Sequence, residues 1–180
     1  MSKQRCFVFL LLMCFLPACD NEKNTAIDFI TEDTRPLVLF FVNTECPVCQ
    51  KYQGSFKPLI KRFSTRVRFY FVFEGNPDSN VLKAFCEYDS IPYSLAVIDQ
   101  EGHIAEKAGA TNTPQCIIFS STPATTPAYS GMPDDRVKSL GQYTTTPGIN
   151  YVENALISLL NHEAVKIPHT TPVGCFIEHR

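Results

Sequence analysis

Short apolar runs alternate with amphipathic stretches along most of the chain, and this alternation predicts an α/β fold. The apolar runs are rich in branched and aromatic residues, which is typical of buried strands; they are residues 37–42, 67–73, 95–98 and 115–119, with a short edge strand at 128–130. The stretches with helical spacing are residues 46–63, 79–88 and 104–108 and an amphipathic segment that begins at Asn150. Pro58 is expected to kink the first of these helices. Right-handed crossovers would place the first strands parallel at the centre of the sheet.

The first 19 residues have a different character and are typical of an export signal. Lys3 and Arg5 precede an unbroken apolar run at residues 6–16. As a helix this run would be only about 16 Å long, whereas the apolar core of a bilayer is about 30 Å thick. The run ends in Leu-Pro-Ala-Cys at 16–19, which resembles a bacterial lipobox, whose cysteine is lipidated and becomes the first mature residue. We therefore expect a lipid anchor on Cys19; an ordinary secretory signal and an uncleaved anchor are the alternatives.

The predicted organisation has four parts. A lipoprotein signal peptide occupies residues 1–18, the lipidated cysteine and a polar tether 19–35, a single domain 36–162, and an irregular tail 163–180. The protein would be anchored in the bacterial cell envelope by its lipid and face the periplasm, where disulfides persist. Five cysteines follow residue 19, and because five is odd, at least one is free, reactive or paired with a partner.

Composition narrows the function further. The 180 residues include 16 Lys and Arg against 18 Asp and Glu, which gives no support to nucleic-acid binding. With 44% hydrophobic and only 19% charged residues, the chain is too apolar to be mainly disordered.

The sequence Cys46-Pro-Val-Cys49 is the sharpest chemical feature. It follows a buried strand directly and begins a helix, so that Cys46 would lie at the helix N-cap, where free backbone N–H groups favour a thiolate. Cys49 would lie one turn further on the same face and can close a disulfide. Pro47 suits the first helical turn, because its missing N–H would be unpaired there anyway. A structural disulfide and half a zinc site are the alternatives, but no second cysteine pair or His-rich motif is present.

A strand, a Cys-X-X-Cys at a helix start and a later Thr-Pro before a strand resemble the thioredoxin-like superfamily over residues 36–162. The resemblance implies a three-layer α/β fold with a central mixed sheet, and a cis proline, here Pro114, lying against the active-site disulfide. It also implies that the backbone of Thr113 pairs with substrate as an added strand. An ordinary trans Thr113–Pro114 bond at a strand entry is the alternative.

The sequence is more similar to a subgroup of bacterial redoxin-type lipoproteins, whose pattern continues beyond the cysteines. The matching pieces are Glu45 to Gln50, 109–114, 129–131 followed by 134–136, and 173–177. Two features depart from thioredoxins. Phe40 stands where thioredoxins carry a buried Asp, so the base would be water, Glu45 or Glu74, and Pro-Val separates the cysteines in place of Gly-Pro.

The remaining cysteines and polar clusters leave several interpretations open. Cys116 and Cys86 are expected to be buried thiols or a pair. Cys175, in the tail, is either an accessible or bridged thiol, or a second redox centre or soft-metal ligand with His169 or His179. The run 134–136 is expected to be a solvated turn with a local ion pair of little energetic weight; a metal or substrate site is the alternative.

The first hypothesis is a membrane-anchored thiol–disulfide oxidoreductase that exchanges disulfides with envelope proteins through Cys46 and Cys49 and needs no cofactor. Its partners would be protein thiols and disulfides, the membrane through the lipid anchor, and an electron-donating membrane reductase. The second is a peroxiredoxin-type thiol peroxidase, although Thr44 is one residue short of the usual Thr-X-X-Cys. The third is a copper or haem-maturation carrier, although copper carriers usually place three residues between their cysteines.

Overall fold

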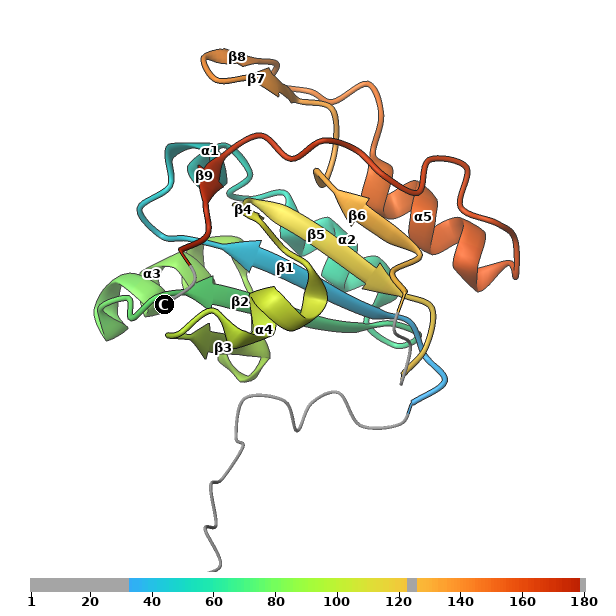
Figure 1. Ribbon diagram of the computed structural model, residues 1–180, viewed down its shortest axis with the longest axis horizontal. Coiled ribbons are helices and arrows are strands. Elements are labelled where there is room, and N and C mark those ends of the chain that lie inside the picture. The colour runs from blue at the N-terminus through green and yellow to red at the C-terminus, as the bar shows by residue number, and fades with distance from the viewer. Residues whose placement is uncertain (1–32, 123–125, 179–180) are drawn as a thin grey trace, which may run out of the picture.

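The computed structural model describes residues 33–122 and 126–178 (Figure 1). The signal peptide predicted at 1–18, the lipidation site Cys19 and most of the tether lie outside the described residues, as does His179. Within the described ranges, no helix is both long and apolar enough to cross a bilayer.

A five-stranded mixed sheet forms the centre of the domain, in the order β3-β2-β1-β5-β6. Its strands are β1 (Leu37–Val42), β2 (Arg68–Glu74), β3 (Ala96–Asp99), β5 (Gln115–Phe119) and β6 (Tyr129–Gly131). The first three strands run parallel, with β1 between β2 and β5, whereas β5 is antiparallel to both β1 and β6. The predicted α/β alternation with parallel first strands is therefore confirmed.

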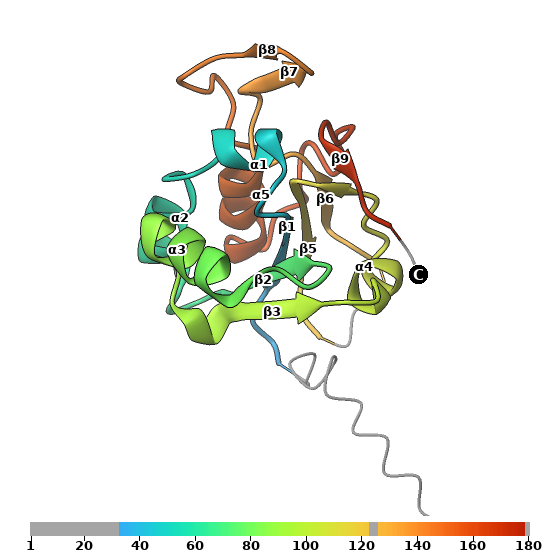
Figure 2. The same cartoon turned by 90° about the vertical axis from the view of Figure 1, so that its left-hand side faces the viewer.

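Helices cover both faces of the sheet, which gives the expected three layers (Figure 2). The helices that pack on one face are α1 (Pro47–Lys51), α2 (Phe56–Phe63), α3 (Ser79–Asp89) and α5 (Tyr151–Leu160). The other face is covered by α4 (His103–Ala108), and a 3-10 turn, η1 (Tyr93–Leu95), leads into β3. Asp78 caps α3 by accepting hydrogen bonds from the backbone N–H groups of Asn80 and Val81.

Strand β1 is apolar at every position because both of its faces are buried. Alternate side chains of β1 contribute to the two separate hydrophobic clusters on either face of the sheet. Phe40 stacks on Phe71 with ring centroids 5.1 Å apart and contacts Phe56 at 4.9 Å. The position at which thioredoxins carry an acid is thus part of an aromatic core here.

The helix expected at 46–63 is two helices, and the cause of the break differs from the prediction. Helix α1 ends at Lys51 and α2 begins at Phe56. Gly54 in the connection has φ +81°, a conformation that glycine adopts without strain. Pro58 lies in the first turn of α2, where a missing N–H costs no helical hydrogen bond, and so it does not kink the helix.

Two small two-stranded sheets complete the fold of the described residues. The polar stretch after β6 contains a hairpin of β7 (Val137–Ser139) and β8 (Gln142–Tyr143). The tail after α5, which the sequence leaves irregular, runs back across the domain toward α1 (Figure 1). There its strand β9 (Cys175–Phe176) pairs with β4 (Asn112–Thr113).

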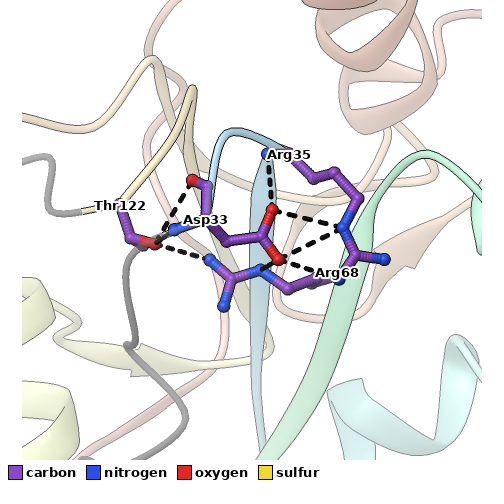
Figure 3. Close-up of polar contacts among 4 residues, drawn as sticks. All are labelled: Asp33, Arg35, Arg68 and Thr122. Carbon is purple, nitrogen blue, oxygen red and sulfur yellow. Dashed lines mark hydrogen bonds and ion pairs between the residues drawn. The ribbon is translucent and has the colours of Figure 1, made fainter.

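Asp33 joins the start of the described chain to the sheet (Figure 3). Its backbone pairs with that of Thr122, and its carboxylate makes ion pairs with Arg35 Nη2 at 2.8 Å and Arg68 Nε at 3.4 Å. Hydrogen bonds from Arg35 lower the pKa of Asp33 to about 2. This cluster ties the entry to β1 to the loop that follows β5.

Candidate functional site

Cys46 lies where the sequence places it, at the N-cap of α1, directly beyond the carboxyl end of β1. The turn between them is held by Asn43, whose carbonyl accepts from Cys46 N at 3.2 Å and whose Oδ1 accepts from Glu45 N at 2.8 Å. Pro47 is the first residue of the helix. The Cys46 side chain is only 2% exposed.

Cys49 is the buried partner in the same helix. Its side chain is 1% exposed, and its sulfur accepts a hydrogen bond from the backbone N–H of Asn43 at 3.4 Å. Burial raises the pKa of the Cys49 thiol well above its usual range, and the neighbouring Cys46 raises it further. Cys49 therefore keeps its proton while Cys46 is ionised.

The pKa of Cys46 is lowered to about 4, chiefly by a hydrogen bond from the Cys49 thiol. Burial opposes this shift, but a hydrogen bond from the Cys175 thiol and the backbone N–H groups of Cys49 and Cys175 reinforce it. At neutral pH the Cys46 sulfur is accordingly a thiolate, which is the form that attacks disulfides.

The Thr113–Pro114 peptide bond is cis, as expected from the resemblance. The carbonyl oxygen of Thr113 lies 3.2 Å from Cys46 Sγ, so the residue before the proline contacts the reactive sulfur directly. The structure thus brings all four expected site residues of the domain together, namely Cys46, Cys49, Thr113 and Pro114.

Gln115 shapes this loop, although its position in the sequence did not reveal it. Its side-chain oxygen accepts hydrogen bonds from the backbone N–H groups of Thr111 at 2.9 Å and Asn112 at 3.1 Å, while its nitrogen donates to Ser130 Oγ at 3.1 Å. A buried amide in an otherwise apolar strand, immediately after the Thr-Pro, is the sequence signal that points to such a role.

Cys175 comes to the reactive sulfur from the far end of the chain. Its Sγ donates to Cys46 Sγ over 2.7 Å, and its strand β9 is antiparallel to β4 with Cys175 opposite Thr113. Burial, followed by the adjacent Cys46, raises the pKa of Cys175 to about 11. Cys175 thus lies beside the reactive sulfur, while the backbone of His169 pairs with that of Ser130.

The other open pairings do not form. The described cysteines are all free thiols, and Cys86 and Cys116 are buried in α3 and β5 respectively. No group of three or more His, Cys, Asp or Glu side chains among residues 33–122 and 126–178 is arranged to hold a metal ion.

The run 134–136 is not the solvated turn expected from its charges. The Asp134 side chain is 5% exposed, and it pairs with Arg136 Nη2 at 2.7 Å. The Arg136 guanidinium also lies 4.8 Å from the ring centroid of Tyr52 and donates to the carbonyl of Lys51 at 3.2 Å. This buried pair holds the end of α1 against the β6–β7 connection.

Of the two acids considered as a base, Glu74 is the one built into the site. Its carboxylate accepts hydrogen bonds from Asn43 Nδ2 at 3.1 Å and from the backbone N–H of Glu178 at 3.0 Å. It thereby links the turn before Cys46 to the tail. Glu45 is exposed.

Comparisons with known proteins show the family and the fold of this chain. The model of the AhpC/TSA family matches residues 14–129. No curated protein matches the sequence.

Solved structures share the fold at low sequence identity. An uncharacterised conserved protein from Geobacillus kaustophilus is 20% identical with a TM-score of 0.67, covering 83% of this chain and 79% of its own. A hypothetical protein from Sinorhizobium meliloti is 17% identical with a TM-score of 0.60, covering 82% and 81%. A thioredoxin-like protein in its oxidised form is 11% identical with a TM-score of 0.53, covering 73% and 82%. The fold is therefore thioredoxin-like.

Proposed function

This chain belongs to the AhpC/TSA family, and from that premise we propose that it is a thiol–disulfide oxidoreductase acting on other proteins through Cys46 and Cys49. The observation that carries the proposal is the asymmetry of the two thiols. The pKa of Cys46 is lowered to about 4, whereas that of the buried Cys49 is raised well above its usual range. At neutral pH the Cys46 sulfur is therefore an ionised nucleophile, whereas Cys49 is a protonated thiol.

The exchange follows from this asymmetry. The Cys46 thiolate attacks a substrate disulfide, forms a mixed disulfide and expels one substrate thiolate, which takes up a proton. Once Cys46 is in a disulfide its negative charge is gone, and the charge repulsion that raises the pKa of Cys49 disappears with it. Cys49 then loses its proton, attacks Cys46 and releases the second substrate thiol. Run in reverse, the same steps oxidise a substrate dithiol.

The edge of β4 is the proposed substrate-binding backbone. Thr113 faces Cys46 with its carbonyl and lies in a strand that already accepts an antiparallel partner. An extended substrate segment would pair with it and present a cysteine to Cys46. Pro114 and Gln115 act as positioning residues for this edge.

We further propose the setting in which the enzyme acts. The apolar run and Leu-Pro-Ala-Cys at 16–19 support export and a lipid anchor on Cys19 in the bacterial envelope, with the domain facing the periplasm. Its partners there would be protein thiols and disulfides, together with an electron-donating membrane reductase. The exchange itself requires no cofactor.

An insulin-reduction assay on the mature chain with Cys19→Ser tests the activity. Cys46→Ser should abolish turnover, whereas Cys49→Ser should trap mixed disulfides, because the resolving thiol is missing. Cys86→Ala, which removes a buried thiol away from the site, is the matched control and should retain activity. Wild-type turnover by Cys46→Ser, or capture of no partner by Cys49→Ser in the native host, would contradict the proposal.

Peroxide reduction is a second candidate, favoured by one observation. Cys46 is 2% exposed, so that only a small oxidant would reach it while the tail is in place. Its thiolate would take one oxygen atom from a hydroperoxide to give a sulfenic acid and an alcohol or water, and a second thiol would then condense with it and release water. Consumption of hydrogen peroxide in the presence of dithiothreitol, absent in Cys46→Ser, would support this activity; no consumption above background would exclude it.

A further inference from the structure

We propose that the tail segment, residues 168–178, is a tethered substrate: it occupies the β4 edge, and its Cys175 is a third catalytic cysteine that exchanges disulfides with Cys46. This inference rests on the proposed function, because Cys175 takes the position that a cysteine of an external substrate protein would occupy next to Cys46. It goes beyond that function by assigning a role to the C-terminus and by limiting which segments fit the site.

The first supporting observation is how the tail lies on the cis-proline loop. Cys175 is opposite Thr113 and Phe176 is opposite Asn112 in an antiparallel pair. One step further, the backbone N–H of Ile177 donates to the carbonyl of Thr111 at 3.0 Å. An extended segment thus continues beyond β4 and presents its cysteine to the reactive sulfur, the arrangement proposed above for a substrate.

Close backbone approach at Gly174 is the second observation. A Cβ at this position would lie 2.0 Å from the carbonyl oxygen of Thr113 and 3.1 Å from Pro114 Cδ. No L-side chain fits there without displacing the loop. The site therefore selects a segment with glycine immediately before its cysteine, and the chain itself supplies one.

The tail is also held upstream of the cysteine. Thr170 N donates to the carbonyl of Ser130 at 3.0 Å, and Thr170 Oγ1 accepts from Met132 N at 2.8 Å. Gly131 accommodates this contact, because a Cβ there would lie 2.1 Å from Thr170 Oγ1. Residues 171–174 therefore connect two anchored points, and the end of the tail can leave β4 while Thr170 keeps it close by.

Disulfide exchange between Cys175 and the Cys46–Cys49 disulfide needs no further oxidant or reductant. In the oxidised protein, the Cys175 thiol gives up its proton and attacks the Cys46 sulfur of the Cys46–Cys49 disulfide. One S–S bond breaks and one forms, and the proton passes to Cys49. Two electrons stay within the three sulfurs, so that the step isomerises the disulfide and leaves Cys49 reduced.

The tail also controls access. With β9 in place Cys46 is 2% exposed, and the edge that would receive an external segment is already paired. An external substrate must displace the tail, and it competes best when it too is extended and carries Gly-Cys. Opening of this short segment requires a few backbone hydrogen bonds to break and the buried Ile177 side chain to leave its apolar cluster, a local event that does not unfold the central sheet.

Disulfide mapping after oxidation with glutathione disulfide tests the third cysteine. In Cys49→Ser, Cys46 should first bind glutathione, and Cys175 should then displace it, so that mass spectrometry finds a Cys46–Cys175 bond and free glutathione. In Cys49→Ser/Cys175→Ser, glutathione should stay on Cys46. A stable Cys46–glutathione adduct in Cys49→Ser with Cys175 still reduced would overturn the inference and leave the proposed function standing. If Cys46 stays reduced in both variants, with neither a glutathione adduct nor a bond to Cys175, the inference and the proposed function would both be overturned.

Alkylation of Cys46 by iodoacetamide tests the closed edge. Gly174→Val should unseat β9 and raise the alkylation rate by about tenfold or more, because the segment is held only locally. Phe176→Ala is the matched control: the Phe176 side chain is 80% exposed, so its removal should leave the rate near that of the wild type. Equal rates in all three proteins, with the fold of Gly174→Val confirmed by circular dichroism, would show that the tail does not close the site.

Discussion

The thiol of Cys175 donates a hydrogen bond to the sulfur of Cys46, with 2.7 Å between the two sulfur atoms, although the two residues are 129 positions apart in the sequence. Neither cysteine is in a disulfide, and the second hydrogen-bonded neighbour of Cys46 is Cys49 from its own helix. One nucleophile thus has two candidate resolving thiols, one buried in the domain and one carried by a displaceable strand.

The pKa of Cys46 should depend on both neighbours, in a fixed order. Cys49→Ala removes the hydrogen bond that lowers the pKa of Cys46 most, and Cys175→Ala removes a weaker hydrogen bond. Both variants should therefore raise the pKa of Cys46 above about 4, and Cys49→Ala should raise it further. Thiolate absorbance in the ultraviolet, followed from acid to neutral pH, measures the midpoint. Cys86→Ala is the control, and a larger shift in Cys175→Ala than in Cys49→Ala would contradict the assigned causes.

Asp89 should make the protein less stable as the pH rises. Its side chain is buried at the end of α3, accepts a hydrogen bond from Gly54 N, and has a pKa raised from 3.8 to about 6 by desolvation. Between these two values the folded protein holds a proton that the unfolded chain has lost, so that stability falls across this window and the penalty is complete above about pH 6.

Asp89→Asn should remove that penalty while keeping an oxygen for Gly54. We expect a gain in the free energy of unfolding of about 1–3 kcal/mol at pH 7, shrinking toward pH 4, measured by urea denaturation. Glu87→Gln, which removes an acid from the exposed face of the same helix, is the control. If Asp89→Asn is less stable than the wild type at pH 7, the ionised Asp89 carboxylate stabilises the fold.

The Asp134–Arg136 pair should matter far more than a surface pair. Arg136→Ala leaves a buried carboxylate without its partner and should cost about 3 kcal/mol of stability. Arg62→Ala breaks an exposed pair with Glu153 and should cost at most about 1 kcal/mol. Chemical denaturation of the two variants compares them directly, and similar losses would argue against the buried environment.

Gly54, rather than Pro58, should be sensitive to substitution in the α1–α2 connection. Gly54→Ala places a Cβ at φ +81° with no atom within 4 Å to resist it, so its cost is the backbone strain alone, about 1 kcal/mol. Lys57→Ala on the exposed side of α2 should change the stability by less than about 0.5 kcal/mol. Thermal unfolding of the pair gives the measurement; an unchanged melting temperature in Gly54→Ala would mean that the connection tolerates another conformation.

Much of the fold was predictable because its signals are local. The run 37–42 forms β1 without a residue's error, since a short, continuous apolar run suits a strand buried on both faces. The position of Cys46 at a helix start followed from the turn residues and from Pro47. The break at Gly54 was missed because a proline is a stronger helix breaker in sequence than a glycine, yet it is harmless in a first turn.

The sequence by itself determined the α/β alternation and the Cys-Pro-Val-Cys at a helix start, because periodicity and helix-start chemistry act over a few neighbouring residues. That the Thr-Pro faces these cysteines was implied only by the resemblance to thioredoxin-like proteins. Only the tertiary structure decided that Cys175 lies against Cys46, that Gln115 holds the cis-proline loop, and that Asp134 is buried beside a partly exposed Arg136. These depend on strand pairing between distant segments and on which side chains the packed core excludes from water, and neither leaves a pattern within a short stretch of chain.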